Sequence, residues 1–88
     1  MPQVHNQLET MKDYYEETRE IGDLLAASGL EVERQQLTEV VAAGFTATEI
    51  LSGVSWHLTR IAGQYPDLDA SLRARIKILV AALEKVLN

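Results

Sequence analysis

The spacing of the apolar residues restricts the fold of this chain more than any other feature. Near the N-terminus, steps of three and four residues place one stripe on a single side of an α-helix, namely Val4, Leu8, Met11, Tyr15, Thr18, Ile21 and Leu25. Similar stripes follow, consisting of Val32, Gln36, Leu37, Val40 and Val41, then Leu51, Val54, Leu58 and Ile61, and finally Leu68, Leu72, Ile76, Leu79, Leu83 and Val86. No stretch indicates a strand, so the sequence predicts an all-α protein.

Glycine and proline residues divide this helical sequence into segments. Gly29 is a suitable helix stop, because glycine enters the left-handed backbone conformation without strain. Pro66 then limits the residue before it, and Asp67 or Asp69 can cap the last helix. We expect one domain, residues 1–88, folded as an antiparallel bundle of three to four helices. The expected helices cover about residues 4–28, 31–43, 46–64 and 68–87.

The segment around Gly44 permits two interpretations. In the first, one helix stops at Gly44 and the next starts at Thr46, with Glu49 reaching back to complete a capping box. Phe45 and Ile50 then have the spacing of a hydrophobic staple. In the second, one helix continues through the glycine, because the apolar alternation continues and an internal glycine costs only about 1 kcal/mol. We favour the break because three local signals agree.

The same segment resembles the helix-turn-helix motif of DNA-binding proteins. The resemblance rests on Gly44 in the turn and on Ile50 in the second helix. Val40 departs from it by occupying the position of a small residue, and Gly53 by occupying that of an apolar residue. Residues 46–56 contain no Arg, Lys, Asn or Gln, so bases and phosphates would meet few donors. We therefore interpret the segment as a corner of the bundle and keep a divergent helix-turn-helix regulator as the alternative function.

The charge and hydropathy of the chain exclude several classes of partner. The net charge is −5, and the first 33 residues hold eight acidic and two basic side chains. Nucleic-acid binders usually have a concentrated basic face, so we expect no binding to nucleic acid. No apolar run approaches the roughly 20 residues that span a bilayer, so we expect no membrane partner. The N-terminus lacks the pattern of a signal peptide, which predicts a cytoplasmic protein.

The residues that commonly carry chemistry form no recognisable motif in this chain. There is no cysteine, which excludes a disulfide framework and a thiolate site. The two histidines, His5 and His57, do not have the spacing that places two metal ligands on one helical face. A phosphate-binding glycine loop and a nucleophile elbow are also missing. We expect a protein that is not an enzyme and has no catalytic, metal or cofactor site.

A candidate surface for a partner protein lies on the first helix. Tyr14 and Tyr15 point about 100° apart on a helix, so one joins the core and the other lies at its edge. A tyrosine beside carboxylates offers a large contact area at a low entropy cost. Trp56 is a further candidate, because its face of the third helix is otherwise small and polar. The candidate partner-binding residues are Asp13, Tyr14, Glu16, Glu17, Glu20 and Trp56.

The acidic face of the first helix needs compensation, because charges of one sign repel one another. One solution is a basic partner protein. The other is provided by the chain itself, if basic residues of the last helix lie beside the first helix within the fold or across a dimer. These basic residues are Arg73, Arg75 and Lys77.

The last helix indicates self-association. From Ile76 to Leu83 only Lys77 is polar, and a helix that is apolar on more than one side is buried on more than one side. In so short a chain a second subunit must cover the far side, so we expect a homodimer. Its interface residues would be Ile78, Val80 and Leu87. The sequence as a whole predicts a small, acidic, non-enzymatic helical bundle that acts in protein–protein interaction or regulation.

Overall fold

The computed structural model describes the backbone of residues 7–87 and the side chains of residues 14–87. Its four helices are α1 (Gln7–Ala27), α2 (Glu31–Ala43), α3 (Ala47–Gln64) and α4 (Ala70–Leu87). The predicted all-α bundle is confirmed, and the break after α2 rules out one continuous helix through Gly44. The predicted start of the first helix, residues 4–6, lies outside the described residues.

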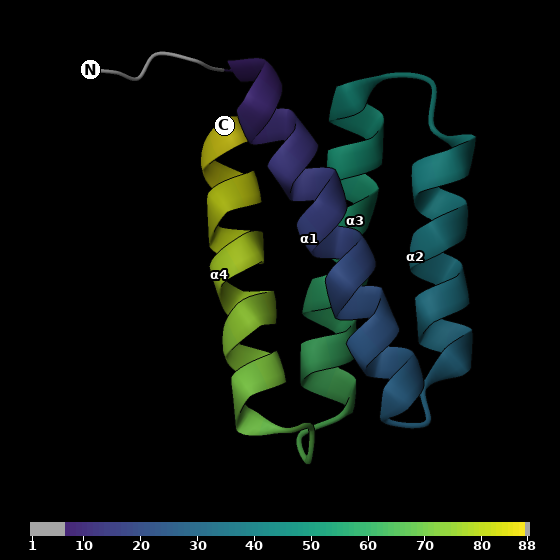
Figure 1. Ribbon diagram of the computed structural model, residues 1–88. Helices are drawn as coiled ribbons and strands as arrows, with labels where there is room; N and C mark the ends of the chain where they lie inside the picture. The colour runs from purple at the N-terminus through teal and green to yellow at the C-terminus, as the bar shows by residue number, and fades with distance from the viewer. Residues whose placement is uncertain (1–6, 88) are drawn as a thin grey trace.

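The helices run alternately in opposite directions, and helices that follow one another in the chain lie side by side (Figure 1). α1 packs against α2 and α4, and α3 also packs against α2 and α4. α1 and α3 therefore occupy opposite corners of the bundle. The buried core draws on all four helices and consists of Ile21, Leu25, Leu37, Leu51, Val54, Leu58, Ile61, Leu72, Ile76, Leu79 and Leu83. Every one of these residues belongs to a stripe that the sequence predicts.

The turn between α1 and α2 has the hydrogen bonds of a Schellman motif. Gly29 has a φ of 90°, the left-handed conformation that glycine adopts without strain. Its N–H donates to the carbonyl of Ala26 over 3.0 Å, and the N–H of Leu30 donates to the carbonyl of Leu25 over 2.9 Å. The predicted helix stop is thus confirmed, with α1 ending at Ala27 rather than at residue 28.

At the corner between α2 and α3, the predicted N-cap is confirmed, but the predicted hydrophobic staple is wrong. The Thr46 hydroxyl accepts a bond from the N–H of Glu49, and the Glu49 carboxylate accepts one from the N–H of Phe45, both over 3.1 Å. However, Phe45 is 93% exposed, so the predicted hydrophobic staple does not form. Ile50 instead packs against Gly44. A Cβ atom added to Gly44 would collide with the side chain of Ile50.

The last helix is confirmed close to its predicted bounds. The sequence predicts a start at about residue 68, and α4 begins at Ala70. Asp69 precedes the helix, and its Oδ2 accepts bonds from the N–H groups of Ser71 over 3.0 Å and Leu72 over 3.3 Å. A hydrogen bond from the Ser71 hydroxyl, together with these two backbone bonds, lowers the pKa of Asp69. The carboxylate satisfies backbone donors that lack partners at a helix N-terminus.

Two valines predicted on apolar stripes face the solvent instead. Val32 is 64% exposed and Val86 is 50% exposed. In the first turn of α2 the inward position belongs to Glu33, which is only 6% exposed. Glu33 precedes the core residue Leu37 by one helical turn, so it points to the same side, whereas Val32 points away.

Candidate functional site

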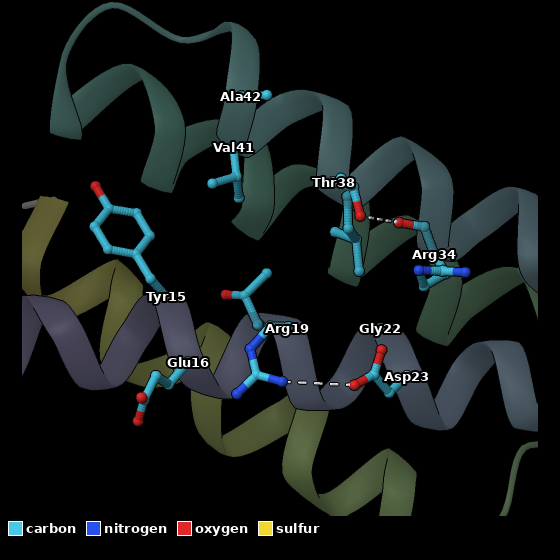
Figure 2. Close-up of a pocket in the computed structure, with 11 residues that line it drawn as sticks. Tyr15, Glu16, Arg19, Gly22, Asp23, Arg34, Thr38, Val41 and Ala42 are labelled. Atoms are coloured by element: carbon cyan, nitrogen blue, oxygen red, sulfur yellow. Dashed lines mark hydrogen bonds and ion pairs between the residues drawn. The ribbon is translucent and has the colours of Figure 1, made fainter.

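Side chains of α1 and α2 line a groove between these two helices (Figure 2). Its volume is about 400 Å³. Its largely apolar floor consists of Tyr15, Thr18, Gly22, Leu37 and Val41. Its rim is mostly polar and consists of Glu16, Arg19, Asp23, Arg34, Thr38 and Ala42. An apolar recess with a polar rim is the usual construction of a binding site.

The groove is closed at one end and open at the other. At the closed end α1 and α2 approach each other at Gly22, where a Cβ atom would lie 3.1 Å from Cγ of Arg34. Toward the opposite end, Tyr15 and Val41 project into the space between the two helices (Figure 2). Both side chains are half-buried and also pack against the core.

Three charged groups on the rim, Arg19, Asp23 and Arg34, are paired with near neighbours on their own helices. Arg19 lies 3.7 Å from Asp23 on α1, and Arg34 lies 2.6 Å from Glu31 on α2. Exposed ion pairs of this kind contribute little to stability and are screened by salt.

The acidic side of α1 that faces α4 is partly neutralised within the fold. Arg75 donates two hydrogen bonds to Glu17, over 2.9 and 2.7 Å, and one to Glu20 over 2.8 Å. The hydrogen bonds to these two carboxylates raise the pKa of Arg75, and Glu17 makes the larger contribution. Arg73 has a different role, because it donates to the carbonyls of Ala62 and Tyr65. Of the three candidate compensators, Arg75 is the one that reaches carboxylates of α1 within the part of that helix whose side chains are described.

The remaining acidic candidates are distributed differently. Glu16 is exposed and belongs to the groove rim, facing away from Arg75. The side chain of Asp13 lies outside the described residues. Tyr14 and Tyr15 are both half-buried and both pack against the core. The sequence predicted that only one of them would join the core. It is Tyr15 that also lines the groove.

Trp56 lies apart from the other partner-binding candidates. It is on α3, at the corner of the bundle opposite α1, and is 62% exposed. The guanidinium of Arg60 lies 5.8 Å from the centre of its ring, and the His57 ring meets it edge-on with centres 5.0 Å apart. The structure therefore does not gather the six candidate residues into one surface.

A network of polar side chains connects α2 to α3 and to Tyr65, the residue that follows α3. Glu33 accepts a hydrogen bond from Arg60 over 2.7 Å and from the Tyr65 hydroxyl over 2.7 Å. Arg60 also donates to Gln36 and Gln64. The bond from Arg60 lowers the pKa of Glu33, against the effect of burial, and the bond to Glu33 raises the pKa of Tyr65. Each carboxylate oxygen has a partner, which is the arrangement of a structural network.

His57 sits at the edge of this network. Burial lowers its pKa, and the nearby charge of Arg60 acts in the same direction. Its Nδ1 lies 3.4 Å from the Arg60 guanidinium, and its ring lies against Trp56. The charge of Glu33 acts in the opposite direction and raises the pKa of His57, but less than the other two effects lower it. Within residues 14–87, no group of three His, Asp or Glu side chains is placed to hold a metal ion.

The three candidate self-association residues of α4 are not equivalent. Ile78 is 70% exposed, whereas Val80 and Leu87 are half-buried and pack against the core of their own chain. Self-association through α4 stays a prediction, and Ile78 is the residue that would contribute most to it.

No family model matches this chain, and no curated protein or solved structure is significantly similar to it. In the described part of the chain, none of the helices is long and apolar enough to cross a membrane.

Sequence reasoning missed most of the groove. Thr18 and Tyr15 belong to the predicted stripe of the first helix, and Leu37 and Val41 to that of the second. The stripes thus identify the floor residues but assign them to the core. No local signal indicates that the two helices separate enough to leave part of that floor open.

Proposed function

We propose that this chain is a small, acidic, non-enzymatic protein-interaction module of the cytoplasm that binds an amphipathic helix of a partner protein between α1 and α2. The observation that supports this proposal most strongly is the apolar groove of about 400 Å³ with its polar rim. Helices that dock in this way insert apolar side chains at positions i, i+4 and i+7.

The dimensions of the groove suit such a helix. Along α1 the lining extends from Tyr15 to Asp23, about 12 Å at 1.5 Å per residue. Side chains at positions i and i+7 of a docked helix are separated by about 10.5 Å along its axis. A recess of this size takes two or three apolar side chains, and the rim would meet the polar flanks of the same helix.

The charge of the protein favours a basic partner. The net charge is −5, and the excess of acidic residues lies in the first third of the chain, which includes α1. Two of these acids, Glu17 and Glu20, are engaged by Arg75, so the remaining attraction is a long-range field rather than a set of specific pairs. Such a field raises association rates and is weakened by salt.

The proposal predicts binding of a synthetic amphipathic peptide. The probe is a fluorescein-labelled peptide of about 18 residues, long enough to form a helix, with Leu at i, i+4 and i+7 and Lys on its flanks. We expect saturable binding in fluorescence polarisation, with a slower association rate as salt increases. A scrambled peptide of equal composition should not bind, and a version with Glu in place of Lys should bind more weakly. Equal binding of the three peptides would contradict the proposal.

A matched pair of variants tests the location of the site. Ala42 and Ala43 are adjacent exposed residues at the end of α2, and Ala42 is the one that lines the groove. We expect Ala42→Arg to weaken binding of the Lys-flanked peptide at least tenfold, about 1.4 kcal/mol, by obstruction and repulsion. Ala43→Arg adds the same charge outside the groove and should leave the affinity unchanged. An equal loss in both variants would exclude the groove as the site.

The alternative function, a helix-turn-helix regulator, has less support in the structure. The two helices of that motif cross at about 90–120°. Here α2 and α3 lie side by side in opposite directions (Figure 1). This is the arrangement of a bundle corner, and it leaves α3 packed along α2 and α4 rather than projecting from the surface.

We expect no binding to nucleic acid. The net charge of −5 repels phosphate, and electrostatic binding to DNA is strongest at low salt. The measurement is a gel-shift titration with random duplex DNA at about 50 mM salt. Micromolar or tighter binding there would favour the regulator over the interaction module.

A further inference from the structure

The outward face of α4 carries an exposed isoleucine with lysines beside it. Ile78 is 70% exposed. Ala74 and Ala81, about one turn before and after it, lie on the same side of the helix and are also exposed. Lys77 and Lys85 border this strip, and neither has an ion-pair partner in the part of the chain whose side chains are described. The face is thus a short apolar strip with basic side chains next to it.

We infer that this face of α4 binds in the groove between α1 and α2 of a second copy of the same chain. The inference rests on the proposed function, because α4 is then a helix of the class that the groove is proposed to bind. Ala74, Ile78 and Ala81 occupy positions i, i+4 and i+7 and span about 10.5 Å, within the length of about 12 Å of the groove. Ile78 enters the apolar floor, and the two alanines allow the helices to approach closely.

The distribution of charge favours a second copy as the occupant. Residues 14–43, which form most of α1 and all of α2, contain seven acidic and two basic side chains. Residues 44–87, which include α3 and α4, contain four acidic and five basic side chains. Docking α4 on α1 and α2 therefore brings the basic half of one molecule against the acidic half of the next. Contact between two like halves would place charges of the same sign together.

Carboxylates on the α1 side of the groove have nearly the same separation as the lysines of α4. Glu16 and Asp23 are both on the rim and lie about 10.5 Å apart along α1. Lys77 and Lys85 lie about 12 Å apart along α4. Arg19 is paired with Asp23, but over 3.7 Å and with both side chains exposed, so it competes only weakly with an incoming lysine.

This contact joins two different surfaces, because the groove is lined by α1 and α2 and contains no residue of α4. Each added copy keeps a free groove or a free α4 face, so association continues beyond two copies until a ring closes. The contact also regulates the proposed function. A groove that holds the α4 face of a neighbour is closed to other helices, so the apparent affinity for a partner falls as the protein concentration rises.

The mass of the native protein in solution provides the first test. By light scattering we expect 9.8 kDa in dilute solution and an average mass that rises past twice this value at high micromolar concentration. The association should weaken as salt increases, because the charges involved are exposed. A mass of 9.8 kDa at every concentration would overturn the inference. A mass that stops at two copies would overturn it as well.

Two variants, each lacking one side of the contact, provide the sharper test. Ile78→Glu changes the α4 face, and Ala42→Arg obstructs the groove. Each variant alone should remain at 9.8 kDa. An equimolar mixture should form a complex of two chains and nothing larger, because it retains one intact face and one intact groove. A mixture that stays monomeric excludes the inferred contact.

Trp56→Glu is the matched control, because it places the same charge at a similarly exposed position of α3. It should associate like the native protein, and its conversion to a monomer would contradict the inference. Circular dichroism checks that all variants are folded.

The Lys-flanked peptide separates this inference from the proposed function. Ile78→Glu keeps an intact groove, so at high protein concentration it should bind the peptide more tightly than the native protein does. Peptide binding by a native protein that stays at 9.8 kDa would overturn the inference and leave the proposed function in place. Association of the native protein and of the mixed variants, without any peptide binding, would overturn the proposed function and leave the contact between copies.

Discussion

Replacing Glu33 with Ala is expected to lower the free energy of unfolding by about 2–3 kcal/mol at neutral pH. The loss is larger than for a surface acid because Glu33 is only 6% exposed and its side chain bonds to both Arg60 and Tyr65. Removing the carboxylate leaves the guanidinium without its opposite charge in a partly buried position. Urea unfolding monitored by circular dichroism measures the change. Glu31→Ala, which replaces an exposed acid of the same helix turn, is the control. If it lowers the free energy of unfolding by the same amount, the network does not add to stability.

The contribution of Glu33 should also depend on pH. The hydrogen bond from Arg60 lowers its pKa below the ordinary value of 4.5, and that from Tyr65 acts in the same direction. A carboxyl group whose pKa is lower in the folded state stabilises the fold above the pKa of the unfolded state. That stability is lost as pH falls from about 4.5 through the lower pKa of the folded state.

The variant Glu33→Gln isolates this titration. It keeps a hydrogen-bond acceptor at position 33 but cannot ionise. Asp69 also has a lowered pKa, but it is present in both proteins, so its effect cancels when the two are compared. We expect the difference in unfolding free energy between the native protein and Glu33→Gln to shrink between pH 5 and pH 3, around the ordinary pKa of 4.5. A difference that stays constant over this range would contradict the assigned cause.

The network also explains where prediction from sequence fails. The spacing of apolar residues identified the core and the order of the helices, because periodicity is a local property. At the start of α2 the same reasoning placed Val32 inside, whereas Glu33 is buried there. The partners that make this burial favourable, Arg60 and Tyr65, are 27 and 32 residues away in the chain. Only the assembled fold brings them together, so no local pattern could indicate the exchange.

The candidate site was predictable to a smaller extent than the fold. The acidic helix and the exposed tryptophan follow from the sequence, but their separation on opposite corners depends on the order in which the helices pack. The groove depends on how α1 and α2 diverge after the Gly29 turn and their close approach at Gly22. The run from Ile76 to Leu83 predicted burial on two sides. In the structure Val80 packs partly against the core, and Ile78 remains exposed.

Gly53 is the position where a single added side chain should disturb the packing of α3 most directly. A Cβ atom there would lie 2.7 Å from Cγ1 of Val40 on α2, well inside van der Waals contact. Val40 is β-branched and half-buried, so it cannot rotate away without strain. We expect Gly53→Val to lower the free energy of unfolding by about 2–3 kcal/mol through overpacking. Valine is a better helix former than glycine, which offsets only a few tenths of this loss.

Gly63 provides the matched control, because it lies in the same helix and a Cβ atom there would meet nothing within 4 Å. Gly63→Val should therefore leave stability unchanged or slightly raised. Both variants are compared with the native protein at one protein concentration. Shortening the opposing side chain in the double variant Val40→Ala, Gly53→Val should recover part of the loss, because the added atoms then occupy the vacated space. Equal destabilisation at positions 53 and 63, without recovery, would mean that α2 and α3 do not pack closely at Gly53.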